Sequence, residues 1–352
     1  MAGTYVYAVI PSEERVIFEV AGMDDDHEEV YSLPHGGVAA VVGASPLADY
    51  RGLRRDQAAR YLLTHQRVVE TVMHDSPLLP LRFGTVLPDE SWVSRLLAQG
   101  APLFRTTLDR VAGQAQMEIV VLWNLQQVFA EIGQEAHVVQ LKEQVATRPP
   151  EETLGERVAI GQMVQASLEQ RRTALQDHVV HRLGQVALDV VINPHMDDSM
   201  VANVALLLDQ AGREALDRRL ATLDREFEGR LLFRCVGPLP PYSFATVEVE
   251  MPSFPAVDRA RRLLGLGETN TGGEIKRAYH QLAGQLHPDR NRQDPNAEAR
   301  MAELTLAYGL LSHYAGHQSP GRDGGGTAIC CFDRQSVEQT LLIALQRQEV
   351  AT

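Results

Sequence analysis

The feature that most constrains the fold is an amphipathic run that stops at a proline, at residues 274–291 (EIKRAYHQLAGQLHPDRN). Its apolar residues recur at intervals of four, three and four, which places them on one face of a helix. These residues are Ile275, Tyr279, Leu282 and Leu286. Pro288 disfavours helical backbone at His287, so the helix is predicted to end there. The tripeptide His287, Pro288 and Asp289 then lies in an exposed loop, where a partner can reach it.

A second amphipathic run follows at once. Asp294 and Pro295 match an N-cap and a first-turn proline. An apolar stripe comes after them, formed by Met301, Leu304, Tyr308 and Leu311. Two antiparallel helices joined by a short loop are predicted, because each stripe needs an apolar surface to pack against. Upstream, residues 263–266 (LLGL) close a short helix and lay apolar side chains against the pair.

In this order, the Leu-Gly-Leu start, the two stripes and the loop tripeptide resemble a J-domain, the DnaJ-type module, over roughly residues 255–316. The resemblance implies that the His-Pro-Asp loop engages a heat-shock ATPase chaperone and that the preceding helix has a basic face. Here Lys276, Arg277 and Arg290 supply that face, while Gly284 and Gln285 stand where lysine or arginine is expected. A helical glycine costs about 1 kcal/mol relative to alanine. The alternative is a hairpin that serves only as a docking surface.

Composition excludes several classes of protein. The 352 residues suggest two or three domains, and a formal charge of −13 argues against a nucleic-acid binder, which needs clustered lysine and arginine. Three cysteines, two of them adjacent, do not suit a disulfide framework, so a reducing cytoplasm is expected. No apolar run approaches the length of a membrane-spanning helix, and the N-terminus does not match an export signal. Neither a membrane nor a cofactor is expected.

The first third of the chain alternates strand and helix patterns. Strands are predicted at TYVYAVI, at GGVAAVVGA after a turn at residues 34–37, at 78–87 and at 117–123, with helices at 55–74 and about 90–111. This order favours an α+β domain over residues 1–125, in which helices cover one face of a ferredoxin-like sheet.

The middle of the chain begins with a Pro149–Pro150 break and a helical run from about Glu152 to Leu188, long enough to stand out as an arm or as half of a helical hairpin. Strand, helix, strand, proline turn and strand follow, which indicates a second α+β domain over residues 126–254. The J-like segment interrupts this domain. After a flexible linker at 317–326, residues 327–352 return to it, and 340–345 (TLLIAL) supply a strand or a closing helix.

Two fragments in this α+β frame identify a second family. They are Leu79–Val86 (LPLRFGTV) and Gly237–Phe244 (GPLPPYSF), behind a chain that opens with TYVYAVIP. Together they resemble the gas vesicle accessory proteins of the GvpF/GvpL type, over most of residues 4–250; Leu239 stands where the family commonly has tryptophan. The resemblance implies a non-enzymatic role in assembling gas vesicles in the cytoplasm, by binding the small apolar shell subunit GvpA and other accessory proteins.

Three residues of these fragments are candidate partner contacts, each with a structural alternative. Phe83 is most simply a core residue, and Arg82 a solvated or salt-bridged edge residue. Gly84 suits a bulge or close packing. Tyr242 is expected to pack beneath the proline turn with its hydroxyl hydrogen-bonded.

Other candidates for chemistry are weaker. His178 and His181 lie three apart on a predicted helix and match either half of a metal site or plain helix surface. Asp24–Asp26 lack the pattern of a calcium loop, and residues 193–198 (NPHMDD) suit a turn. No nucleotide-binding loop or protease motif is present. An assembly protein is therefore expected, with a stand-alone J-type cochaperone as the alternative and an enzyme as a distant third.

Overall fold

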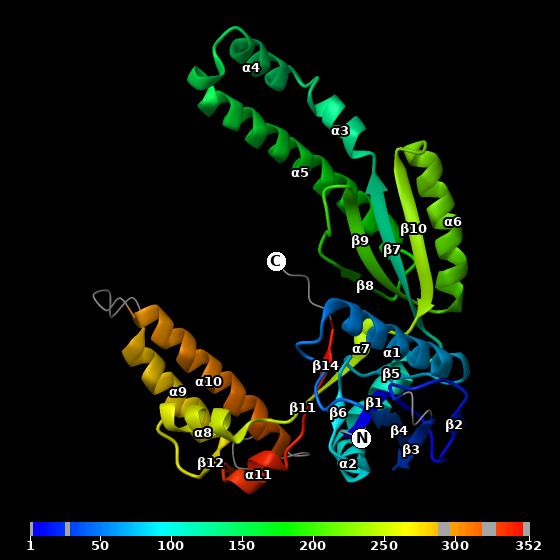
Figure 1. Cartoon of the computed structure of the whole chain (residues 1–352), viewed down its shortest axis with the longest axis vertical. Helices are drawn as coiled ribbons and strands as arrows, with labels where there is room; N and C mark the ends of the chain where they lie inside the picture. Colours follow the sequence, from blue (N-terminus) through cyan, green and yellow to red (C-terminus); the bar gives the residue numbers. More distant parts are fainter. Residues whose placement is uncertain (1–2, 25–28, 288–295, 319–328, 348–352) are drawn as a thin grey trace. The chain divides into compact units, whose positions relative to one another are not determined.

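The computed structural model describes residues 3–24, 29–287, 296–318 and 329–347 (Figure 1). The chain divides into two compact units. The first unit comprises Met1–Val68, Leu81–Thr106 and Val247–Leu345; the second comprises Val69–Pro80, Thr107–Thr246 and Gln346–Thr352. Helices and strands are mixed throughout, which confirms the predicted α+β class.

An antiparallel sheet with strand order β2-β3-β4-β1 forms the core of the first unit, and β6 also pairs with β1. The strands are β1 (Gly3–Ile10), β2 (Ile17–Phe18), β3 (Val30–His35), β4 (Val38–Ser45) and β6 (Val86–Leu87). Strands β1 and β4 are buried along almost their whole length, as their continuous apolar runs require. Gly36 and Gly37 have positive φ angles of 59° and 83°, which suit the tight turn between β3 and β4. The predicted helices are α1 (Arg55–Asp75) and α2 (Glu90–Val111).

A second antiparallel sheet, in the second unit, has the strand order β10-β7-β9-β8. Its elements along the chain are β7 (Ala115–Trp123), the helical arm, β8 (Asp189–Ile192), β9 (Met200–Leu208), α6 (Gln210–Phe227) and β10 (Leu231–Leu239). This is the β-α-β-β-α-β succession of a ferredoxin-like unit. The ferredoxin-like sheet predicted for residues 1–125 is thus not confirmed there, because the last strand of that segment, β7, pairs with β9 and β10.

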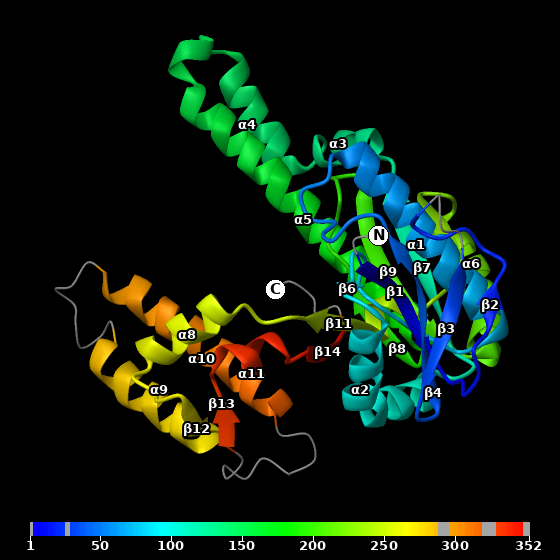
Figure 2. The same cartoon turned by 60° about the horizontal axis from the view of Figure 1, so that its bottom comes forward.

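The helical arm of the second unit consists of α3 (Leu125–Ile132), α4 (Ala136–Ala146), a short 3₁₀ turn (Pro150–Glu152) and α5 (Leu154–Gly184). Helix α5 confirms the long helix predicted after the double proline, and Figures 1 and 2 show α4 running alongside it. Helices α3 and α4 were not predicted. They pack on α5 through Ile132 and Val138, which are fully buried together with Leu168 of α5.

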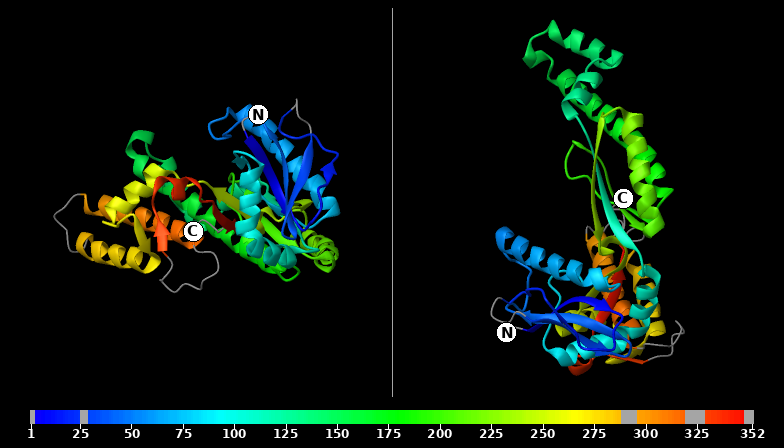
Figure 3. Two further views of the ribbon diagram at one scale, coloured as in Figure 1. Left: turned by 90° about the horizontal axis from the view of Figure 1, so that it is seen from below. Right: turned by 90° about the vertical axis from the view of Figure 1, so that its right-hand side faces the viewer.

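A helical module follows in the first unit, formed by α8 (Phe254–Leu263), α9 (Gly272–Leu286) and α10 (Ala297–Gln318). Helices α9 and α10 lie side by side (Figure 2; yellow and orange in the left view of Figure 3), as predicted. Ile275, Leu304 and Leu311 are fully buried between them, and the other stripe residues are partly buried against the same core. Leu264 and Leu266 also contact this core. The predicted cap residues Asp294 and Pro295 lie outside the described residues.

The module has additions that the sequence analysis did not place there. Strand β12 (Thr269–Thr271) pairs with β13 (Ile329–Cys331), and α11 (Arg334–Glu338) follows. Residues after the linker, assigned above to the second α+β domain, contribute four side chains to the helical core: Cys330, Phe332, Val337 and Leu342. Tyr314 on α10 donates a hydrogen bond of 2.6 Å from its hydroxyl to the Cys331 carbonyl.

The predicted segment at 340–345 forms a strand rather than a helix. This strand, β14 (Leu342–Gln346), pairs with β11 (Thr246–Glu250) in a two-stranded sheet of its own. Helix α10 extends through Gln318 into the predicted linker, and the remaining linker residues, 319–326, lie outside the described residues. None of the helices in the described part of the chain combines the length and the apolar character needed to cross a membrane.

Candidate functional site

His287 follows directly after α9 and is the last described residue before the segment that connects α9 to α10. Helix α9 begins with a capping box, in which Thr271 and Glu274 bond each other's backbone N–H groups, and it ends at Leu286. His287 has left the helical conformation, with φ −55° and ψ 129°, and its side chain is exposed. The predicted helix end is therefore confirmed. Pro288 and Asp289, the other two residues of the predicted loop site, lie outside the described residues.

The exposed face of α9 carries the two described cationic residues of the predicted basic face. Lys276 and Arg277 are exposed, one and two residues after the buried Ile275. Gly284 and Gln285 are exposed on the same helix nearer the loop. Arg290 lies outside the described residues. The basic face in the described part of α9 is thus limited to its first half.

Two aromatic rings join α9 and α10. The rings of Tyr279 and Tyr308 stack with centroids 4.2 Å apart and planes inclined by 16°. Stacked aromatic pairs add stabilisation beyond the apolar area that they bury. His287 and the two cationic residues therefore lie on a helix, α9, that is held against α10 by a continuous core.

The LPLRFGTV fragment forms a turn rather than the single strand predicted at residues 78–87. Two-residue strands, β5 (Leu79–Pro80) and β6, flank it, and the Thr85 N–H donates to the Arg82 carbonyl. Gly84 has a φ of +85°, where a side chain would be strained, and its N–H donates to the Tyr5 hydroxyl at 2.9 Å. This backbone reversal explains why the strand is interrupted.

Phe83 and Arg82 make different contacts at this turn. Phe83 is half-buried and meets Tyr50 and His65 edge to face, with centroids 5.6 Å and 5.9 Å apart. Arg82 is largely exposed and forms an ion pair with Glu248 of β11. Its backbone N–H also donates to the Val247 carbonyl at 2.9 Å. Arg82 is thus a salt-bridged residue, whereas Phe83 is half-buried rather than part of the core, and both line an open surface.

That surface is a cleft of about 700 Å³ in the first unit. One wall is the loop and turn around Tyr50 and Phe83, and the other is the end of β11 with the residues after it. The lining residues are 48–51, 82–87 and 248–251. Its lining combines two arginines, three carboxylates, two aromatic rings and several aliphatic side chains, so the cleft suits a polypeptide segment better than a small apolar ligand.

Tyr242 is half-buried. It begins the short helix α7 (Tyr242–Ala245), and the next residue, Ser243, donates its backbone N–H to the Gln116 side chain of β7 at 2.8 Å. Burial raises the pKa of the Tyr242 hydroxyl, and the charge of Glu70 raises it further. The predicted partner for this hydroxyl is not found: it is buried and has no hydrogen-bond partner among the described residues.

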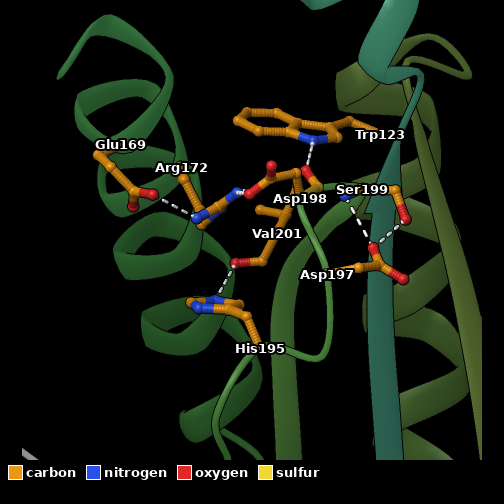
Figure 4. A network of polar contacts seen from close by, with 8 residues as sticks. All are labelled: Trp123, Glu169, Arg172, His195, Asp197, Asp198, Ser199 and Val201. Atoms are coloured by element: carbon orange, nitrogen blue, oxygen red, sulfur yellow. Dashed lines mark hydrogen bonds and ion pairs between the residues drawn. The ribbon is translucent and has the colours of Figure 1, made fainter. Parts of the chain in front are cut away.

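A polar network around the buried Arg172, which was not predicted from the sequence, joins α5 to the loop after β8 (Figure 4). The side chain of Arg172 is only 7% exposed, and it forms ion pairs with Asp198 at 3.0 Å and with Glu169 at 2.7 Å. The Trp123 indole N–H donates to the Asp198 carbonyl at 2.8 Å. Asp197 accepts hydrogen bonds from Ser199, which lowers the pKa of its carboxyl and confirms the turn predicted here.

Trp123 also lines a pocket of about 310 Å³ in the second unit. Its walls come from α3, α5, the end of α6 and the start of β10, and Val128, Leu175, Phe227 and Leu231 make it mainly apolar. Arg171 on its rim is paired with Glu131 at 2.8 Å. No metal-binding cluster of three or more histidine, cysteine, aspartate or glutamate residues occurs among the described residues. His178 instead pairs with Glu226 at 2.8 Å.

Comparison with known protein families finds two matches. The model of the gas vesicle synthesis proteins GvpL/GvpF matches residues 3–246, and the DnaJ domain model matches residues 262–317. Among curated proteins, gas vesicle protein F of Dolichospermum flosaquae is 25% identical over 69% of this chain and 98% of its own. Gas vesicle protein L2 of Halobacterium salinarum is 30% identical over 69% of this chain and 91% of its own.

The DnaJ segment has separate relatives. Chaperone protein DnaJ of Psychrobacter arcticus is 48% identical over 50 residues, which are 13% of that protein. Among solved structures, the crystal structure of gas vesicle protein GvpF from an Anabaena species superposes with a TM-score of 0.58 at 24% identity, over 69% of this chain and 98% of that one. This likeness supports the fold over that share of the chain.

Proposed function

Because this chain belongs to the GvpL/GvpF family of gas vesicle synthesis proteins and also carries a DnaJ domain, we propose that it is an accessory protein of gas vesicle assembly. In this proposal it binds the small apolar shell subunit GvpA and other accessory proteins, in the cytoplasm at growing vesicles. The observation that carries the proposal is the family match over residues 3–246, which spans nearly the whole length of the gas vesicle relatives. The family corresponds to no known class of enzyme.

A physical need supports this role. A shell that excludes liquid water needs subunits with a strongly apolar face, and such subunits aggregate when they are free. A protein that covers an extended or amphipathic segment of the subunit keeps it available for the shell. The 700 Å³ cleft beside Phe83 and Arg82 has the size and the mixed lining for such a segment.

The DnaJ domain adds a second function to the proposal, recruitment of a heat-shock ATPase chaperone to the bound subunit. His287 is exposed where α9 ends, and Lys276 and Arg277 are exposed on the same helix. These three residues, with Pro288 and Asp289, are the proposed contacts for the ATPase. A stand-alone J-type cochaperone remains the alternative, with the GvpL/GvpF part selecting its clients.

Full-length point variants test the two functions separately. A cut at residue 125 would separate β7 from its partners β9 and β10, so fragments of that kind would misfold. We expect His287→Gln to abolish stimulation of the ATPase and to leave capture of GvpA in a pull-down unchanged. His313→Gln is the matched control, because His313 is exposed in the last two turns of α10, at the end of the hairpin remote from the loop.

The cleft is tested by Arg82→Glu, which opposes Glu248 and places a negative charge on its wall. We expect this variant to lose capture of GvpA while it still stimulates the ATPase. Failure of the unmodified chain to capture GvpA or another gas vesicle accessory protein would overturn the assembly role. If His287→Gln cells make normal vesicles, the DnaJ domain is dispensable for assembly.

A further inference from the structure

Strand β10 is an open edge of the ferredoxin-like sheet (Figure 1). In the described part of the chain it pairs only with β7, in register from Leu231 to Val236. Leu232 and Val236 are 54% and 52% exposed, and Arg234 and Cys235 between them are exposed as well. A long edge strand with exposed apolar side chains is a template for another strand unless the protein blocks it.

The opposite edge of the same sheet is blocked. Strand β8 has only four residues, and the guanidinium of Arg347 covers it. Its Nη2 atom lies 2.6 Å from the Asp189 carboxylate and 3.5 Å from the Val190 carbonyl. No comparable contact covers residues 232–236 of β10 within the described chain. The contrast indicates that β10 is kept open.

On its outer side, the backbone of β10 has groups that bond no residue in the described part of the chain. The backbone N–H of Trp123 donates to the Ser199 carbonyl, which lies on the β9 side of β7. Since backbone groups alternate along a strand, those of Leu122 and Val120 point toward β10, where their register partners are Leu232 and Arg234. The N–H and C=O groups of Phe233 and Cys235 then point outward. Pro238, which has no N–H, ends this edge.

The side chains of β10 specify the chemistry of an added strand. Leu232, Arg234 and Val236 share one face, so a carboxylate flanked by apolar residues two positions away on each side would complement them. Arg234 has no ion pair with any described residue, and the nearby Glu118 accepts a hydrogen bond from Gln116 at 3.0 Å. A second copy paired two-fold so that Leu232 meets Val236 would place Arg234 against Arg234, which is unfavourable.

We infer that β10 is a docking edge for an extended segment of another protein, with the pattern apolar–x–acidic–x–apolar. The segment pairs with the outward backbone of Phe233 and Cys235 and places its carboxylate beside Arg234. This goes beyond the proposed function, since it holds wherever the shell subunit binds.

A library of random nine-residue peptides, displayed on phage and selected on the full-length protein, tests the inference. We expect enriched peptides to carry aspartate or glutamate with apolar residues two places before and after it. Selection of the same library on the Arg234→Glu protein should enrich peptides with lysine or arginine in place of the acidic residue. A synthetic peptide of the first selection should bind the unmodified protein about tenfold more tightly than the Arg234→Glu protein.

Backbone pairing is tested by Cys235→Pro, which removes an outward N–H without removing a bond to β7, with Cys235→Ser as the matched control. Binding of the selected peptide should be lost in Cys235→Pro and kept in Cys235→Ser, while circular dichroism shows that both variants are folded. If Cys235→Pro does not fold, the change in peptide preference between the unmodified protein and Arg234→Glu still tests the inference. Peptides without an acidic preference, equal binding by Cys235→Pro, or a dimer of the protein that Cys235→Pro disrupts would each overturn the inference.

Discussion

At the scale of single residues, His65 shows how burial sets a property that matters for stability. It is 2% exposed, its Nδ1 atom lies 3.0 Å from the Tyr5 hydroxyl, and the rings of Tyr7 and Phe83 surround it. Burial lowers the pKa of His65 to about 4. The folded protein therefore binds this proton more weakly than the unfolded chain does, whose histidines titrate near 6.5.

The sign of the pH dependence follows from this lowered pKa. The contribution of His65 to stability is fully present above about pH 6.5 and is lost as the pH falls toward 4, with a total on the order of 3 kcal/mol. We expect urea unfolding to show a smaller drop in free energy between pH 7 and pH 4.5 for His65→Gln than for the unmodified protein. Parallel pH profiles for the two proteins would contradict the assignment.

Replacement of glycine by alanine should change the stability of the protein in opposite directions at two positions. A Cβ at Gly284 of α9 would meet no atom within 4 Å, so Gly284→Ala should stabilise the helix by about 1 kcal/mol. A Cβ at Gly84 would lie 3.2 Å from the Tyr50 Cβ at a φ of +85°, so Gly84→Ala should destabilise the protein. Thermal unfolding of both variants measures the contrast, and a common direction would refute it.

At the scale of elements, the DnaJ module depends on the segment after the linker. Phe332 is 1% exposed and its ring centroid lies 5.5 Å from that of Tyr314 on α10. Phe332→Ala should cost about 3 to 5 kcal/mol through lost burial and the cavity left behind. We expect the amides of α9 and α10 to exchange faster in hydrogen–deuterium exchange. Phe129→Ala, at a site 41% exposed, serves as control and should leave these amides unchanged.

At the scale of the whole molecule, we expect the part of the chain before the DnaJ module to fold without it. The gas vesicle relatives correspond to this chain over 91% to 98% of their own length without it. A chain ending at residue 250, which keeps the contact of Val247 with Arg82, should therefore retain its circular dichroism signature of helices and strands. It should also capture GvpA but not stimulate the ATPase. An unfolded product would contradict this expectation.

The division of the chain into residues 1–125, 126–254 with 327–352, 255–316 and 317–326 stays a prediction. Limited proteolysis of the full chain would test it.

Local patterns in the sequence accounted for the elements whose partners are near in the chain. The stripes of α9 and α10 and the proline after His287 predicted the hairpin, because helix periodicity and proline geometry act over a few residues. The long helix α5 followed in the same way. Both family resemblances depended on such short fragments, and they are confirmed.

The amino-acid sequence by itself determined the α+β class, the helical hairpin and the family, since each depends on local periodicity or on a short motif. Only the tertiary structure decided that β7 belongs to the second sheet, that Phe332 completes the helical core and that Arg172 joins Asp198 and Trp123. Strand pairing and core filling join residues far apart in the chain. Many alternative partners satisfy the same apolar pattern, and only the packing of the whole fold selects among them.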